Sequence, residues 1–238
     1  MNVSIIIPAH NEEESIAATI ASVLERVTVP YELIVVADHC TDRTESIVQE
    51  FIARHDTITM LRNTERRGSF SNAVITGYKA AKGDRIVTVM ADNCDDPGTI
   101  NAMAVKIDDG FDVVCGSRYI KGGRKIGGPW LQDKLSRIVC ITLKLLTGIP
   151  TWDAANSYKM YRSHILKGVN YDIPNAGTEY SMAILFKTYA AGAKITEVPS
   201  TWRGQAMPFV EEWKILKRFK NYWFWYRRAI AKMIKPKE

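Results

Sequence analysis

Several signals that mark common protein classes are missing from this chain of 238 residues. Its four cysteines show no CxxC spacing and no histidine at zinc-finger intervals, which argues against a structural zinc site and favours reduced thiols. No run reaches the roughly 18 apolar residues that a membrane-spanning helix needs. The apolar run at 3–9 lacks the basic leader of a signal peptide. We therefore expect a cytoplasmic protein without a transmembrane segment.

Two nucleotide-binding motifs are missing as well. No GxGxxG follows the first strand-like run and no GxxxxGK[ST] occurs anywhere, which argues against Rossmann dinucleotide and P-loop chemistry. What is present is ordinary for a folded protein, with 46% hydrophobic and 24% charged residues. The net charge of +6 lies in the tail, because nine basic residues and one acid follow from Lys214 onward. The rest of the chain is close to neutral.

Strand-like and helix-like patterns alternate over the first half of the chain, and this order predicts a doubly wound, mostly parallel α/β sheet. We expect strands at 3–8, 31–37, 58–62, 85–90 and 112–117. Helices are expected between them at about 12–26, 43–55, 71–81 and 99–109. The pattern then loosens into a glycine-rich loop at 121–129, a helix at 131–146, a strand at 158–161, a helix at 178–191 and a strand at 194–202. No internal repeat or linker divides the chain.

The most informative stretch runs from Arg85 to Pro97, where an apolar run ends at three aspartates, Asp92, Asp95 and Asp96. Ligands bind at the carboxyl ends of strands in open α/β sheets. Neighbouring carboxylates repel one another unless a cation offsets their charge, which favours a site for Mg²⁺ or Mn²⁺. The alternative is a solvated loop in which Asp96 or Asp95 caps the next helix.

Polar side chains also follow the first two strands. Pro8, His10, Asn11 and Glu12 lie where the first strand leads into a helix, and such a loop can hold a nucleotide base and ribose. The alternative is a proline turn in which Asn11 caps the helix. After the second strand, Asp38 could accept a hydrogen bond from a base.

With these motifs in place, the chain resembles family 2 glycosyltransferases with the GT-A fold, above all the catalytic domains of dolichol-phosphate and polyprenyl-phosphate mannose synthases. The matching stretches keep the family order over roughly Val3 to Arg203; they are SIIIPAHNEEESI, ELIVVADHCTDRT, RRGSFSNAVITGYKAAKGD, VMADNCDDP, FDVVCGSRYIKGG, DAANSYKMYRS and ITEVPSTWR. The resemblance implies a Rossmann-like nucleotide-binding half and an acceptor half. It also implies a nucleoside-diphosphate sugar donor, a divalent ion on the diphosphate, and sugar transfer with inversion.

Carried over by position, the resemblance places Pro8, His10, Glu12 and Asp38 along the nucleotide pocket. It also implies that Gly68 allows the backbone to approach the sugar nucleotide closely. These are the expected donor-binding residues of the first half.

For the metal, Asp92 matches the second aspartate of the family's DxD motif, whereas Met90 stands where the first aspartate usually lies. Ala37 likewise replaces the first acid of the usual DD pair. A hard cation prefers oxygen to the thioether of Met90, so we expect Asp95 to supply the missing carboxylate. The expected metal ligands are therefore Asp92 and Asp95.

Arg118 and Arg203 resemble family arginines near the phosphates. Glu179 resembles an acid near the acceptor, so Asp92, Arg118 and Glu179 are the expected catalytic residues. A hydroxyl acceptor needs a base to remove its proton and an ionised phosphate does not, so Glu179 is either that base or a charge at a helix start. Asp153 resembles a family acid on the acceptor side, with a structural role as the alternative.

The segment from Phe209 to Ile234 has an apolar stripe with the period of an α-helix, flanked by lysines and arginines. We expect residues 1–208 to form the catalytic domain and 209–238 a basic amphipathic helix. That helix either packs on the domain or makes a peripheral contact with an anionic membrane. A nucleic-acid surface is a further alternative.

The expected function is metal-dependent, inverting sugar transfer to a polyprenyl phosphate or lipid-linked glycan, in the cytoplasm or on the cytosolic membrane face. The same chemistry could serve a soluble metabolite, a protein or a modified nucleic-acid base. A catalytically silent sugar-nucleotide-binding protein is a different alternative, because Ala37 and Met90 remove two usual acids. A nucleotidyltransferase lacks support, since the chain has no glycine-rich, lysine-ended nucleotide loop.

Overall fold

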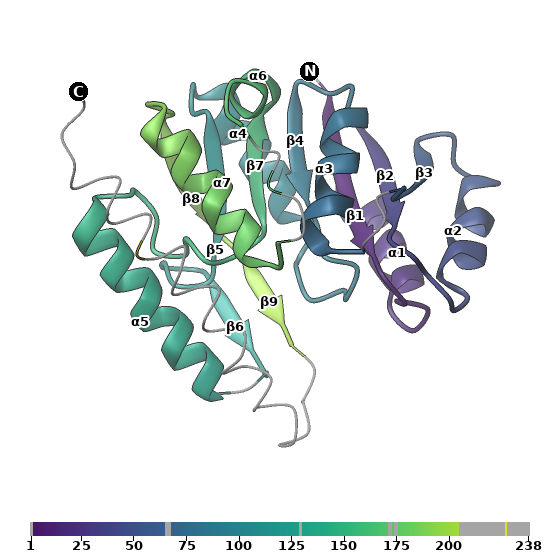
Figure 1. Cartoon of the computed structure of the whole chain (residues 1–238), viewed down its shortest axis with the longest axis horizontal. Helices are drawn as coiled ribbons and strands as arrows, with labels where there is room; N and C mark the ends of the chain where they lie inside the picture. Colours follow the sequence, from purple (N-terminus) through teal and green to yellow (C-terminus); the bar gives the residue numbers. More distant parts are fainter. Residues whose placement is uncertain are drawn as a thin grey trace.

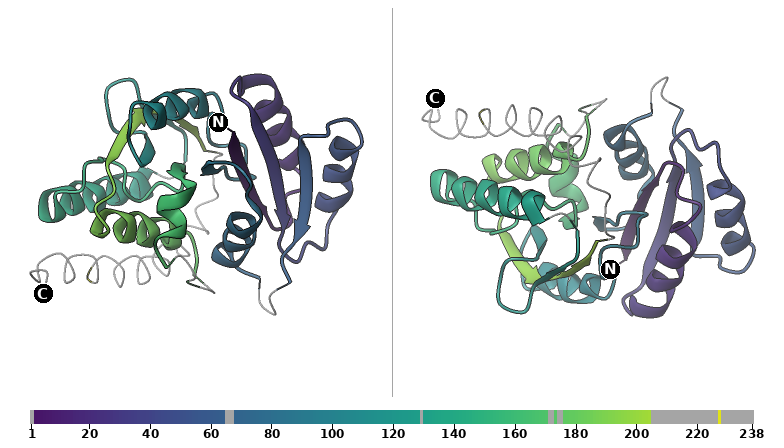
Figure 2. Two further views of the ribbon diagram at one scale, coloured as in Figure 1. Left: turned by 90° about the horizontal axis from the view of Figure 1, so that it is seen from above. Right: turned by 90° about the horizontal axis from the view of Figure 1, so that it is seen from below.

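The computed structural model describes residues 2–64, 68–128, 130–170, 173, 176–204 and 227. A seven-stranded sheet with the order β3-β2-β1-β4-β7-β5-β8 crosses the molecule. Helices cover both of its faces (Figures 1 and 2). Within the described ranges, no helix has the length and apolar character needed to span a bilayer. The predicted mostly parallel α/β fold is confirmed.

The first half of the sheet is parallel throughout. It consists of β1 (Val3–Ala9), β2 (Tyr31–Ala37), β3 (Ile58–Arg62) and β4 (Arg85–Thr88). The chain steps from β1 to β2 and β3 on one side and returns as β4 on the other, so the topological switch point lies between β1 and β4. The β1–β2 register continues to Ala9, whereas the β1–β4 register ends at Ile6. The sheet thus opens between β1 and β4 at Pro8.

Two hydrophobic cores hold the helices on the sheet, because successive strand residues point to opposite faces. Ile5 and Ile7 of β1 pack in one core, and Ile6 packs in the other. The first core takes α1 (Ile16–Arg26), α2 (Thr44–Ile52) and α4 (Thr99–Asp108). The second takes α3 (Phe70–Ala80), α5 (Trp130–Thr147), α6 (Ser163–Lys167) and α7 (Glu179–Ala190). Burial on both faces explains the near-continuous apolar runs of the strands.

The second half of the sheet is mixed. Its strands are β5 (Val113–Ser117), β7 (Lys159–Arg162) and β8 (Ile195–Pro199). The strand β7 runs antiparallel between β4 and β5, while β8 pairs parallel with β5. The antiparallel strand therefore joins the two halves of the sheet.

Two sequence predictions are wrong in detail here. The strand expected at 194–202 is broken at Ser200 into β8 and β9 (Thr201–Arg203), and the expected glycine-rich loop contains β6 (Arg124–Ile126). The reason lies in the backbone of Ser200, whose N–H donates to the Ser117 carbonyl (3.0 Å) and whose carbonyl accepts from Arg124 N–H (3.0 Å). The chain thus leaves the main sheet and pairs with β6 in a small parallel sheet.

The predicted helix from Phe209 to Ile234 and the predicted boundary between 208 and 209 lie outside the described residues, apart from Arg227. Arg227 is exposed. Both expectations about the tail stay predictions.

Candidate active site

The aspartate cluster follows β4 at the carboxyl edge of the sheet, as the sequence predicts. Asp95 is only 5% exposed, and its Oδ1 has no hydrogen-bond partner among the described residues. The backbone of Met90 hydrogen-bonds the carboxyl group of Asp95. Burial first, and then the negative charge of Asp92, raise the pKa of Asp95 to about 7. The site therefore holds a buried carboxyl group that is incompletely satisfied.

Asp96 has a different role from Asp95. Its Oδ1 accepts from Gly98 N–H at 2.9 Å and lies 3.0 Å from Arg26 Nη1. Asp96 thus holds the turn before α4; the N-cap of that helix is Gly98 and no side chain caps it, so the predicted cap by Asp95 or Asp96 is not formed. Asp92 Oδ1 accepts from Cys94 N–H at 3.0 Å and folds the loop back on itself. With Asp96 engaged by Gly98 and Arg26, Asp92 and Asp95 are the carboxylates of this loop available to a ligand.

Glu12 joins this cluster from the end of β1. Its Oε2 accepts from the Ser15 hydroxyl at 2.8 Å. Burial raises the pKa of Glu12, the bond from Ser15 opposes the rise, and the charges of Asp92 and Asp42 add to it. Because Asp92 acts on the pKa of both Glu12 and Asp95, the ends of β1 and β4 contribute to one acidic site.

A second polar group lies beyond β1, at the ends of β2 and β3. Asp38 is 5% exposed, and its Oδ1 accepts from Asn63 Nδ2 at 2.7 Å. The ring of His10 makes a short contact with the backbone carbonyl of Asp38. A Cβ added to Gly68 would lie 3.2 Å from both carboxylate oxygens of Asp38. The structure therefore brings together His10, Asp38 and Gly68, while Pro8 is buried in β1 opposite Val36.

The backbone at this edge adopts an uncommon conformation. In the described part of the chain, the non-glycine residues with positive φ are Asn11, His39 and Asn93, each at 54°. All three lie in loops that follow β1, β2 or β4. Left-handed conformations cost energy for residues with a Cβ and concentrate at ligand sites. Asn11 also accepts from Thr41 N–H at 2.8 Å, which ties the first two loops together.

The strand β9 lies along the aspartate loop. Arg203 N–H donates to the Cys94 carbonyl at 2.7 Å, and Trp202 forms an isolated bridge with Asp95. The side chain of Arg203 is exposed at the end of this strand. Lys125 of β6 stacks on the Trp202 ring, with its Nζ 5.2 Å from the ring centroid. Arg203 is thus brought to the aspartate loop, and its predicted contact with the phosphates stays a prediction. Trp202 is a neighbour that sequence reasoning missed.

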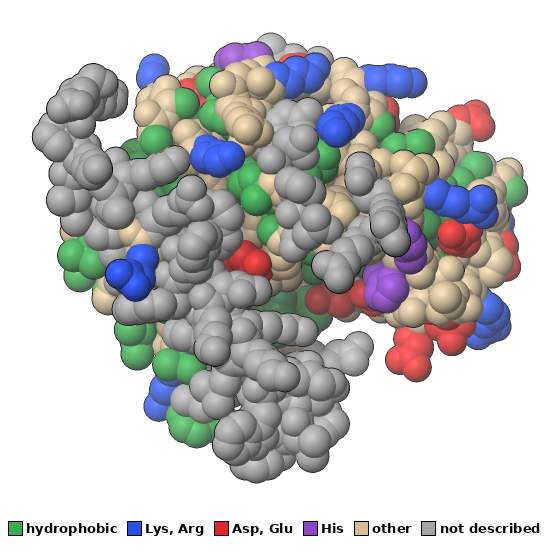
Figure 3. Space-filling model, viewed as in Figure 1, with side chains coloured by type: hydrophobic (Ala, Val, Ile, Leu, Met, Phe, Trp, Pro, Cys, Tyr) green, Lys and Arg blue, Asp and Glu red, His purple; other side chains and the backbone are tan. Residues whose placement is uncertain are grey.

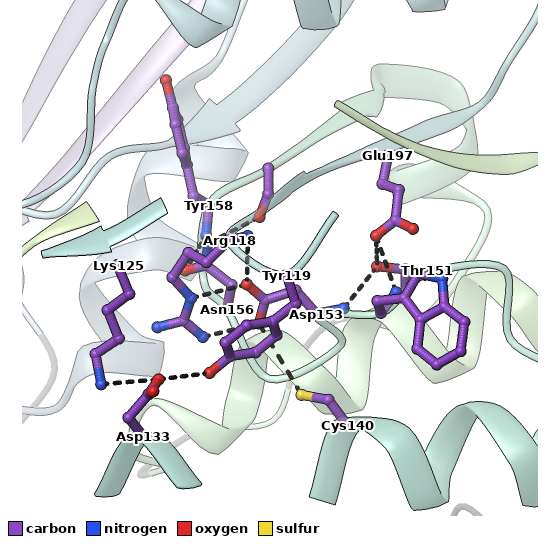
Figure 4. Close-up of polar contacts among 12 residues, drawn as sticks. Arg118, Tyr119, Lys125, Asp133, Cys140, Thr151, Asp153, Asn156, Tyr158 and Glu197 are labelled. Carbon is purple, nitrogen blue, oxygen red and sulfur yellow. Dashed lines mark hydrogen bonds and ion pairs between the residues drawn. The ribbon is translucent and has the colours of Figure 1, made fainter. Parts of the chain in front are cut away.

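Arg118 is held by Asp153 (Figure 4). Its Nε donates to Asp153 Oδ2 and its Nη2 to Asp153 Oδ1, both at 2.7 Å, and Asp153 is fully buried. Burial lowers the pKa of Arg118, but Asp153 outweighs it and the pKa lies above its ordinary value. A bidentate pair of this kind is close to neutral as a unit. The predicted contact of Arg118 with phosphate stays a prediction.

Polar contacts connect this ion pair to its surroundings. Asp153 N–H donates to the Thr151 hydroxyl at 3.1 Å. On the other side, Asp133 of α5 accepts from the Tyr119 hydroxyl at 3.1 Å and lies 3.2 Å from Lys125 Nζ. Figure 4 shows Asp133 and Cys140 pointing from α5 toward the pair. The network fixes α5 against the loops that follow β5.

Glu179 begins α7 and is 7% exposed. Its Oε1 accepts from Gly177 N–H at 3.1 Å, just before the helix. Ala176 N–H donates to the Ser71 hydroxyl at 2.8 Å, so the start of α7 is joined to the start of α3, close to Gly68. The structure thus gives Glu179 a helix-start role, and its role as a base stays a prediction.

Comparison with known proteins agrees with this geometry. The sequence model of the family described as "Glycosyl transferase family 2" matches residues 4–169 of this chain. The chain belongs to glycosyltransferase family 2. Among its relatives is the dolichol-phosphate mannosyltransferase of Pyrococcus furiosus, which is 31% identical over 207 residues, or 85% of this chain and 56% of that protein. The polyprenol monophosphomannose synthase of Mycolicibacterium smegmatis is 25% identical over 203 residues, or 83% of this chain and 76% of that protein.

This family 2 chain spans only 56% of the Pyrococcus protein and 51% of the undecaprenyl-phosphate 4-deoxy-4-formamido-L-arabinose transferase of Serratia proteamaculans. Its fold is similar to that of glucosyl-3-phosphoglycerate synthase from Mycobacterium tuberculosis. The complex of that enzyme with phosphoglyceric acid has a TM-score of 0.73 and 19% identity over 97% of this chain and 80% of the other. A second complex, with Mn²⁺, uridine diphosphate and glucosyl-3-phosphoglycerate, has a TM-score of 0.67 over 97% and 77% of the two chains.

The donor set of this family member suits a hard cation. Among the described residues, no group of three or more His, Cys, Asp or Glu side chains could enclose a metal ion. Mg²⁺ usually binds one or two carboxylates and completes its shell with water and substrate phosphates. Asp92 and the unpartnered buried oxygen of Asp95 fit that requirement. A cation here would need the donor diphosphate to complete its ligands.

Asn63, which donates to the carboxylate of Asp38, is a residue of this strand edge that the sequence predictions missed. It follows β3 directly, as Asp38 follows β2 directly. The signal that could have found it is a polar residue at the end of a third parallel strand.

Proposed function

We propose that this protein transfers a sugar, with inversion, from a nucleoside-diphosphate sugar to a polyprenyl phosphate, and that Asp92 and Asp95 hold the Mg²⁺ or Mn²⁺ ion required. The observation that carries the proposal is the buried, unpartnered Oδ1 of Asp95 beside Asp92. A buried polar atom without a partner costs about 1–3 kcal/mol. A divalent cation supplies the partner that the described protein atoms do not.

The donor is proposed to lie across the switch point between β1 and β4. His10, Asp38 and Gly68 receive the nucleoside, with the carboxylate of Asp38 held in place by Asn63. Arg203, at the end of β9, supplies positive charge for the diphosphate. Glu12, held by its bond from Ser15, adds a carboxyl group next to Asp92 and His10.

The reaction forms a bond from an acceptor oxygen to the anomeric carbon while the bond from that carbon to the diphosphate oxygen breaks. The nucleoside diphosphate leaves with the electron pair. When bound, a divalent cation offsets the charge that develops on this leaving group. The M. tuberculosis synthase complex that contains Mn²⁺ and uridine diphosphate supports the use of such an ion.

A phosphate acceptor fits the state of Glu179. An ionised phosphate needs no base, and the carboxylate of Glu179 is already engaged by Gly177 N–H at the helix start. The names of the relatives from P. furiosus and M. smegmatis point to polyprenyl-linked acceptors. We therefore favour a polyprenyl phosphate over a soluble hydroxyl acceptor, and a location on the cytosolic membrane face.

Donor binding and metal use can be tested together by thermal denaturation. The protein is heated with GDP-, UDP- or dTDP-sugars, with and without Mn²⁺; a ligand at 100 times its Kd adds about 2.7 kcal/mol of stability. We expect one donor to stabilise the wild type in a Mn²⁺-dependent way. Asp95→Asn should lose the Mn²⁺ dependence. Asp96→Asn, which removes the same charge one residue further along the chain, from the turn before α4, should keep it.

Two outcomes would contradict the proposal. One is Mn²⁺-dependent donor binding that survives in Asp95→Asn. The other is tight donor binding by the wild type without sugar release to any acceptor, which would support the catalytically silent alternative.

A further inference from the structure

The outward side of α5 exposes large apolar side chains. Trp130 is 65% exposed, Ile138 57% and Leu145 73%. With Lys134 and Arg137, which are also exposed, these residues form what we call the α5 outer face. Their spacing of about four, seven or eight residues places them along one side of an α-helix. Figure 3 shows green apolar and blue basic side chains at the lower left, where α5 lies in Figure 1.

The opposite side of the same helix is buried. Cys140 and Leu143 are fully buried, and Thr147 lies one turn further along the same stripe. Asp133 adds polar contacts to Lys125 and Tyr119. The helix is therefore anchored by its inner side, and exposure of its outer face does not depend on the helix leaving the protein.

Basic and aromatic side chains are paired at both ends of the face. Lys134 Nζ lies 5.1 Å from the ring centroid of Trp130, and Lys144 Nζ lies 4.6 Å from that of Trp152. Trp152 is 38% exposed. Tryptophan with a lysine at each end of an apolar stripe is the pattern of a helix that lies in the headgroup region of a bilayer.

The sequence around α5 is strongly basic. Residues 118–150 contain seven lysines and arginines and one acid, Asp133. Asp133 is paired with Lys125. Ile126 of β6 is 48% exposed, and Arg124 beside it is exposed too, so the apolar and basic character continues beyond the helix.

We propose that the α5 outer face docks on a bilayer surface that contains anionic lipids. This proposal rests on the proposed function, because a polyprenyl phosphate resides in a bilayer. The strand β6, which leads into α5, pairs with β9, and β9 lies along the aspartate loop. Docking would therefore bring the membrane to the side of the molecule on which β6 and β9 lie along the aspartate loop.

Other occupants fit less well. A second copy of the chain would bring two basic faces together, which repel each other. The tail from Lys214 onward has nine basic residues and one acid, so it too would be repelled by the basic α5 outer face. A single-stranded nucleic acid would stack on successive aromatic rings, but Trp130 and Trp152 lie only at the two ends of the face, and Ile138 and Leu145 between them offer aliphatic surface.

The test is sedimentation of the full chain with vesicles of phosphatidylcholine alone or mixed with phosphatidylglycerol. We expect the wild type to bind the mixed vesicles, and the double variant Ile138→Ser, Leu145→Ser to lose about tenfold in partitioning. Val105→Ser is the matched control, because Val105 is 56% exposed on α4, outside this face. Lys134→Glu should weaken binding, and Arg54→Glu on an exposed site just after α2 should do so less. Circular dichroism confirms that the variants are folded.

The proposal is overturned if the double variant binds mixed vesicles as well as Val105→Ser does. It is also overturned if the wild type binds an oligonucleotide but not vesicles, or if the double variant changes only the oligomeric state. Transfer to a water-soluble, short-chain polyprenyl phosphate separates this proposal from the proposed function. The α5 variants should keep that activity and lose activity only toward an acceptor embedded in vesicles. Absence of sugar transfer by the wild type in both assays would contradict the proposed function and leave the vesicle-binding result to decide the docking proposal.

Discussion

The two halves of the sheet position their polar residues in different ways. In the donor half, β1 to β4, each polar residue follows a parallel strand, and neighbouring strand ends gather them at one edge. In the acceptor half, around β5 to β9, strands change direction and a buried ion pair between Arg118 and Asp153 holds the loops. The first arrangement follows from the order of the strands. The second depends on contacts between residues far apart in the sequence.

The substitution Asp95→Asn tests the role of the donor half most directly. It should reduce sugar transfer about a thousandfold, because it removes a proposed ligand of the ion that offsets the charge on the leaving group. In metal-free protein the same change should raise the free energy of unfolding at neutral pH and above, because it removes the ionised form of a buried carboxyl group beside Asp92. Steady-state kinetics and urea denaturation measure the two effects. Loss of both activity and stability would show that Asp95 is a structural residue.

The stability effect should depend on pH. The folded pKa of Asp95, about 7, lies above the ordinary value of 3.8, so the folded state holds a proton that the unfolded state releases. The stability of metal-free wild type relative to Asp95→Asn should therefore fall as pH rises from about 4 to about 7. A difference that does not change with pH would contradict the raised pKa.

In the acceptor half, Arg118→Ala should lower the free energy of unfolding by about 3–5 kcal/mol, because it leaves the carboxylate of Asp153 buried and unpaired. Arg54→Ala, which breaks an exposed pair with Glu50, is the control and should change little. Urea denaturation measures both. If Arg118→Ala changes stability little but raises the KM for the donor strongly, the result would support the contact between Arg118 and phosphate that the sequence predicts.

Returning to the donor half, Gly68→Ala should weaken donor binding about threefold to tenfold, because the added Cβ lies within contact distance of the Asp38 carboxylate. Isothermal titration with the preferred sugar nucleotide measures the Kd. The rate of transfer at saturating donor should change little. Unchanged affinity would place the nucleoside elsewhere.

The smallest effect is expected for Glu179→Gln. If the acceptor is a phosphate, turnover should stay within about twofold of the wild type, since no proton has to be removed. Complete loss of transfer with donor binding intact would identify Glu179 as a base and favour a hydroxyl acceptor.

The sequence was sufficient for the donor half and insufficient for much of the acceptor half. The strand order predicted that Asp38 and Asp92 would meet at one edge, because parallel strands end on the same side. The pairing of Arg118 with Asp153 joins residues 35 positions apart, and no local sequence pattern predicts it. The same holds for β9, which leaves the main sheet at Ser200 because of backbone bonds to Ser117 and Arg124. The position of Asn63 at this edge could have been predicted from the sequence, since Asn63 follows the third parallel strand.

The unpartnered oxygen of Asp95 also has a consequence for the lifetime of the protein. A ligand that binds only the folded protein makes the empty protein open more often than the loaded one, and proteases cleave opened chains. The buried oxygen of Asp95 without a partner adds to this difference. We expect proteolysis by a nonspecific protease to slow when donor and Mn²⁺ are added together, and to slow less in Asp95→Asn. In a cell, the abundance of this protein would then follow the supply of its sugar nucleotide.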